Sequence, residues 1–169
     1  PPVNSKEDFK KIIEEKFEED AETALAIYPA KDEEQMLDSS KRLLGDSLFG
    51  APSYYAARAM ADRGEDIYFY HFNQKPSGKA GEILGAFHAS EIAYVFGVGG
   101  LGPIEDPELS RIMLAYWTNF SKIGNPNGDD IPDWETMKLN KDTWHLLGPK
   151  IGQENISRMN IYNLLRRIS

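Results

Sequence analysis

Hydrophobic residues in the first part of the chain recur at helical spacing. Asn4 and Ser5 stand before Asp8 as in a capping box, in which a side-chain oxygen accepts from the first free amides, so a helix is predicted to begin there. Its apolar stripe consists of Phe9, Ile12, Ile13, Phe17, Ala21, Ala24, Leu25 and Tyr28. Pro29 is predicted to end it. Two more helices are expected, from Asp32 to about Leu44 with Gly45 as the stop, and from Pro52 to Gly64.

After residue 64 the spacing of the hydrophobic residues changes from one typical of helices to one typical of strands. Residues 67–72 read Ile-Tyr-Phe-Tyr-His-Phe, and nearly every position is bulky. A strand buried on both faces of a mostly parallel sheet has this composition. The glycine-rich stretches 76–85 and 97–103 are predicted to be irregular, and residues 144–147 to form a short strand.

A second strongly amphipathic pattern begins at Asp106 and ends at Gly124, with Pro126 beyond it. Its apolar face consists of Leu109, Ile112, Met113, Tyr116, Trp117 and Phe120. A last helix is expected around residues 156–168. The elements suffice for one domain, but a single convincing core strand cannot build a doubly wound sheet.

Composition narrows the possible functions. The chain has 169 residues, of which 41% are hydrophobic and 11% aromatic, as in one packed domain. Its net charge of −8 disfavours nucleic acid, and no apolar run is long enough for a membrane span. The absence of cysteine excludes disulfides and thiolate metal sites. It suits a cytoplasmic protein or a secreted microbial one, and no signal-peptide pattern opens the chain, so the compartment stays open.

Three histidines are the candidates for chemistry. His71 lies in the strand pattern and His145 beside Trp144, so both are interpreted as core histidines. His88 follows the strand in a loop bracketed by glycines, with Glu91 three residues later. Open α/β sheets place their active sites in such loops. No H-E-x-x-H, phosphate-loop or G-x-S-x-G motif is present, so neither a metal nor a cofactor is expected.

Three segments together resemble one known family. Residues 85–97 combine a histidine, an acid three residues later and V-F-G; residues 116–127 read YWTNFSKIGNPN; and residues 46–49 begin the approach to the histidine block. Their order and spacing are similar to those of the type-B carboxylesterases, which include the cholinesterases. The similarity runs from about Asp46 to about Leu147, whereas residues 1–45 match only as helices.

The resemblance implies an α/β-hydrolase fold and hydrolysis of small carboxylic esters by a Ser-His-Glu triad. Residues 1–169 would form the C-terminal portion of one catalytic domain, with helices around the last strands of a mostly parallel sheet. His88 would be the general base, and Glu91 would support the site through hydrogen bonds without being the triad acid. Leu84 and Phe87 would line the substrate pocket. Ala89 departs from the glycine that the family commonly has after this histidine.

The order of the triad along the chain implies a partner. In α/β-hydrolases the serine and the acid precede the histidine, and no serine elbow occurs before His88. The serine, the glutamate and the oxyanion hole are therefore expected in an N-terminal portion of the same esterase, without which the fold is incomplete. Two alternatives stay open: a non-catalytic binding or adhesion protein with the same fold, and a free-standing helical binding domain.

Overall fold

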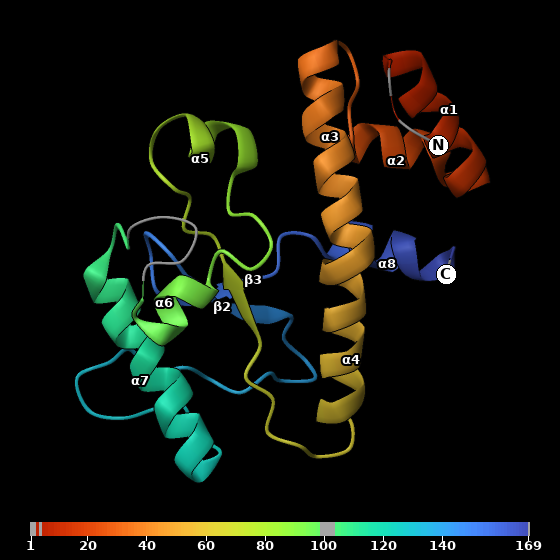
Figure 1. Cartoon of the computed structure of the whole chain (residues 1–169). Coiled ribbons are helices and arrows are strands. Elements are labelled where there is room, and N and C mark those ends of the chain that lie inside the picture. The colour runs from red at the N-terminus through yellow and green to blue at the C-terminus, as the bar shows by residue number, and fades with distance from the viewer. Residues whose placement is uncertain (1–2, 4, 99–103, 169) are drawn as a thin grey trace. The chain divides into compact units, whose positions relative to one another are not determined.

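The computed structural model describes residue 3, residues 5–98 and residues 104–168. The chain divides into two compact units, one formed by residues 1–59 with 157–169 and the other by residues 60–156. Figure 1 labels their helices and strands. No helix among the described residues is both long and apolar enough to cross a membrane.

The first unit is helical. It comprises α1 (Lys6–Phe17), the short η1 (Glu18–Asp20), α2 (Ala21–Ile27), α3 (Glu33–Gly45), η2 (Asp46–Gly50), most of α4 (Ala51–Ala61), and α8 (Met159–Arg167). Helix α1 begins as predicted, since the amide of Asp8 donates to Ser5 Oγ at 3.1 Å. The prediction of one unbroken helix to Tyr28 is wrong: Glu18, with φ at +46°, interrupts it.

Helix α3 ends at Gly45, as predicted, but the chain does not leave the helical conformation there. Gly45 has right-handed helical angles (φ −61°, ψ −45°), and the helix continues through the π-helical turn η2 into α4. A glycine ends a helix by adopting the left-handed conformation, and Gly45 does not adopt it. The later glycine, Gly64, has φ at +87° and lies just after α4.

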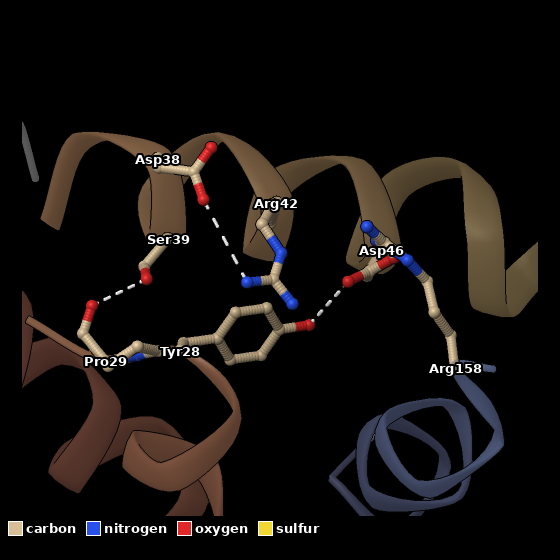
Figure 2. A network of polar contacts seen from close by, with 7 residues as sticks. All are labelled: Tyr28, Pro29, Asp38, Ser39, Arg42, Asp46 and Arg158. Carbon is tan, nitrogen blue, oxygen red and sulfur yellow. Dashed lines mark hydrogen bonds and ion pairs between the residues drawn. The ribbon is translucent and has the colours of Figure 1, made fainter. Parts of the chain in front are cut away.

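A buried carboxylate joins three segments of this unit (Figure 2). Asp46 is 3% exposed; it accepts a hydrogen bond of 2.8 Å from the Tyr28 hydroxyl and pairs with the Arg158 guanidinium. Burial, followed by the charge of Asp46, raises the pKa of Tyr28, so the hydroxyl stays a donor. Ser39 Oγ donates to the carbonyl of Pro29 at 2.6 Å in the same network. These contacts tie the residues before α8 to η2 and to the end of α2.

The second unit contains a three-stranded sheet in the order β1 (Tyr70–Phe72), β2 (Thr143–Leu147), β3 (Gly152–Asn155). β1 runs parallel to β2, and β3 is antiparallel to β2. The short strand predicted at 144–147 is confirmed, and all five residues of β2 are buried. The strand predicted at 67–72 is shorter and only half-buried, because β1 lies at the edge of this sheet. β3 escaped prediction because its Gly-Gln-Glu-Asn sequence has no β-branched residue.

Helix α7 (Pro107–Ile123) supplies the core of this unit. Asp106 caps its start, with Oδ1 accepting from the Leu109 amide at 2.9 Å, and Gly124 ends it with φ at +72°. Four residues of the predicted apolar face are buried, whereas Trp117 is half-buried and Phe120 is exposed. The buried four are Leu109, Ile112, Met113 and Tyr116.

Two short helices lie between β1 and α7. The stretch 76–85, predicted to be irregular, contains α5 (Gly78–Leu84), and α6 (Ile92–Phe96) was not predicted. Of the loop predicted at 97–103, Gly97 and Val98 form a turn, and residues 99–103 lie outside the described residues. His88 therefore lies in a turn between two helices and does not directly follow the strand.

Candidate active site

His88 lies on a tight turn whose backbone is unusual at two positions. Gly85 follows α5 with φ +64° and ψ −152°, a conformation open to glycine almost alone. Both the amide and the hydroxyl of Ser90 donate to the carbonyl of Phe87, at 3.1 and 2.6 Å, and close the turn. Ala89 between them has φ at +68°. The turn leaves His88 exposed.

The segment after the turn is anchored in the core. Glu91 precedes α6, and its carbonyl accepts from the amides of Tyr94 and Val95, at 3.0 Å each. Both of those side chains are buried. Ser110 Oγ on α7 donates to the carbonyl of Tyr94 at 2.9 Å. The C-terminal side of the His88 turn is thus held against α7.

Glu91 itself is half-buried and lies near Tyr70 of β1. Burial of the Tyr70 hydroxyl, followed by the negative charge of Glu91, raises the pKa of Tyr70. The Tyr70 ring packs edge-on against Trp117 at 5.3 Å. The charge of Glu91, the carboxylate expected to support the site, therefore acts on a phenol whose ring packs against α7.

The two expected pocket residues flank the same turn. Leu84, the last residue of α5, is 55% exposed, and Phe87 is half-buried. Residues 84–91 therefore hold all four of the site residues expected from the sequence. Among the described residues, no group of three His, Asp or Glu side chains could hold a metal ion.

The other two histidines pack against aromatic side chains. The His71 ring stacks on Trp144, with centroids 4.4 Å apart, and His71 is half-buried. His145 is fully buried, its Nε2 lies 3.2 Å from the Tyr116 hydroxyl oxygen, and its ring stacks on Trp134. Burial lowers the pKa of His145 to about 4, against an opposing hydrogen-bond contribution from Gln153. The prediction that His145 is a core histidine is confirmed.

One pair of residues near the site escaped the sequence reasoning. Ser77 precedes α5 and Glu105 precedes the cap of α7, 28 residues later. The Ser77 amide donates to both carboxylate oxygens of Glu105 at 2.8 Å, and its hydroxyl donates to Oε1 at 2.9 Å. No local pattern could reveal a contact over this separation.

Comparison with known proteins gives a consistent result. The sequence profile described as "Carboxylesterase family" matches residues 3–163. The chain is 40% identical over 118 residues to the medium-chain fatty acyl-CoA hydrolase precursor of Anas platyrhynchos, a match that covers 66% of the chain and 21% of that protein. It is 36% identical over 132 residues to carboxylesterase 5A of Homo sapiens, covering 70% of the chain and 23% of that protein.

Liver carboxylesterase of Sus scrofa is 38% identical over 113 residues, which cover 63% of the chain and 19% of that protein. The chain spans about a fifth of the length of these relatives. The family has the α/β-hydrolase fold, and helices with a small mixed sheet are consistent with a part of it. The profile covers nearly every residue from the first helix to α8, and the chain belongs to the carboxylesterase family.

Proposed function

We propose that this chain supplies the histidine of a Ser-His-Glu triad that hydrolyses carboxylic esters, and that His88 is this histidine. The observation that carries the proposal is the exposure of His88, because a group from outside the chain can approach an exposed side chain. His145, in contrast, is fully buried, and His71 is stacked on a tryptophan. A general base must come within hydrogen-bond distance of its nucleophile, so an exposed histidine suits the role.

The reaction would follow the course of serine esterases. His88 accepts the proton of the serine hydroxyl while the serine oxygen attacks the ester carbonyl carbon. The imidazolium then gives this proton to the leaving alcohol, and an acyl-enzyme remains. His88 next takes a proton from water, whose oxygen attacks the acyl carbon. The imidazolium then returns this proton to the serine oxygen as the bond from that oxygen to the acyl carbon breaks, which releases the acid and restores the serine hydroxyl. An imidazole performs both transfers because its ordinary pKa, about 6.5, is near neutrality.

The remaining groups would come from an N-terminal portion of the same esterase. Serine, glutamate and oxyanion hole are all required, and the chain lacks a G-x-S-x-G motif. The matched residues cover only 21–23% of these relatives, which supports this division. Within the chain, Glu91 would support the site, and Leu84 and Phe87 would line the substrate pocket beside His88.

Carboxylic esters are the substrate class that most of the related proteins' names support. One relative is named a fatty acyl-CoA hydrolase, which acts on a thioester. A thioester carbonyl is attacked by the same serine in the same way, so the triad chemistry covers both. We take oxygen esters with an apolar acyl group as the test substrates, because the exposed side chain of Leu84 is apolar.

The test is hydrolysis of a p-nitrophenyl ester by the assembled esterase, in which the chain is joined to its N-terminal portion. His88→Ala is expected to reduce kcat by at least about a thousandfold, as loss of a triad member does. His71→Gln is the matched control, because it removes a histidine of the same unit and should keep most activity. Undiminished turnover by His88→Ala would refute the role of His88. A wild-type protein that binds esters without hydrolysing them would favour the non-catalytic alternative.

A further inference from the structure

Helix α5 has a largely exposed surface. Lys79, Glu82, Ile83 and Leu84 of this helix are all exposed. Among the described residues, α5 packs extensively against no other helix or strand. In Figure 1, α5 (green) stands away from the sheet and from α7, at the end of two connecting segments. The contacts of those segments therefore contribute to the position of α5.

The first of these segments is held by Glu105. Its carboxylate accepts three hydrogen bonds of 2.8–2.9 Å from the amide and the hydroxyl of Ser77, directly before α5. Glu105 is itself well anchored, because the next residue, Asp106, caps α7 and Leu109 in the first turn of α7 is 1% exposed. Hydrogen bonds to an ionised carboxylate are stronger than neutral ones. Glu105 therefore links a core helix to the start of α5.

A close backbone contact transmits this restraint into α5. A Cβ added to Gly81 would lie 1.7 Å from the carbonyl oxygen of Pro76. The middle of α5 thus rests directly on the residue before Ser77. By restraining Ser77, Glu105 also restrains Pro76. Because α5 contacts Pro76 at Gly81, the restraint extends to this helix and to Leu84 at its end.

We propose that Glu105 is a positioning residue for substrate binding: through Ser77 it fixes α5, and with it the Leu84 side of the pocket. This inference rests on the proposed function, in which Leu84 lines the pocket. The His88 turn has restraints of its own, from Ser90 to Phe87 and through α6 to α7. Loss of the Glu105 contact should therefore weaken the binding of substrates that reach α5 and leave the chemical step intact.

The experiment compares Glu105→Gln with the matched control Glu108→Gln in the assembled esterase. Glu108 is also an exposed carboxylate of this region, but it pairs with Arg111 on α7 and does not contact α5. Two measurements are made: KM and kcat for p-nitrophenyl acetate and p-nitrophenyl octanoate, and hydrogen exchange of the Gly85 amide. That amide closes α5 by donating to the carbonyl of Gly81 at 3.0 Å.

Glu105→Gln is expected to raise KM for the octanoate about three- to tenfold, the effect of losing a charge-assisted hydrogen bond, with kcat for the acetate within about twofold. Exchange at Gly85 should accelerate by a similar factor. Ser77→Thr, which keeps the hydroxyl and the amide, should behave as wild type. Gly81→Ala should raise KM for the octanoate as well, since its methyl group displaces α5 from Pro76.

The inference is overturned if Glu105→Gln matches Glu108→Gln in both measurements, or if KM rises equally for the acetate and the octanoate. These outcomes differ from a failure of the proposed function. If His88 is not the general base, His88→Ala keeps its turnover whatever Glu105→Gln does. The exchange rate of Gly85 reports the Glu105 contact without any reference to activity.

Discussion

Ala89→Gly is expected to stabilise the turn that presents His88. Ala89 has φ at +68°, in the left-handed region, where a Cβ crowds the following carbonyl and costs roughly 1–2 kcal/mol. Glycine removes that crowding but gives the unfolded chain more freedom, an opposing effect of about 0.4–1 kcal/mol. The net result is a gain of about 0.5–1 kcal/mol. Ala89 departs from the glycine that the family commonly has after this histidine, and the backbone angle is a physical reason why glycine suits the position.

The assay is hydrogen exchange of the Ser90 amide, which donates to the Phe87 carbonyl across the turn. If glycine favours the closed turn by 0.5–1 kcal/mol, this amide should exchange about two- to fivefold more slowly in Ala89→Gly. The control is Ala56→Gly at an exposed position inside α4, where glycine costs about 1 kcal/mol. Urea unfolding should therefore show opposite signs for the two variants. Faster exchange at Ser90, or destabilisation by Ala89→Gly equal to that of Ala56→Gly, would refute the argument.

Three further predictions concern stability. Arg158→Ala leaves the buried Asp46 carboxylate without its cation and should lower the free energy of unfolding by about 2–4 kcal/mol in urea titrations. A loss below about 0.5 kcal/mol, which is typical of an exposed ion pair, would contradict the pairing. The pKa of His145 is lowered to about 4, so neutral His145 contributes fully to the free energy of unfolding above about pH 6.5. This contribution, up to about 3 kcal/mol, is lost as the pH falls towards 4. His145→Gln should therefore make the free energy of unfolding depend less on pH in this range. Gly148→Ala brings a Cβ within 1.9 Å of Asn73 Oδ1. The crowding should lower the free energy of unfolding by roughly 1–2 kcal/mol and Tm by several degrees. An unchanged Tm would show that Asn73 moves aside.

The sequence by itself determined the features that depend on neighbouring residues. The α7 helix was predicted to begin at Asp106 and to end at Gly124. The structure confirms both ends, and both depend on hydrogen bonds within a few residues. The burial of His145 followed from its apolar neighbours. The motifs around His88 and Trp117 were sufficient for the family, which the comparisons then showed independently.

Only the tertiary structure decided the features that depend on distant residues. Gly45 looked like a helix stop, yet its backbone stays helical and the chain continues into η2, where Asp46 binds Tyr28 and Arg158 from other segments. β3 has no strand composition and forms by pairing with the buried β2. The contact of Ser77 with Glu105 joins residues 28 positions apart. Such contacts carry no local pattern, because their energy comes from groups that only the folded chain brings together.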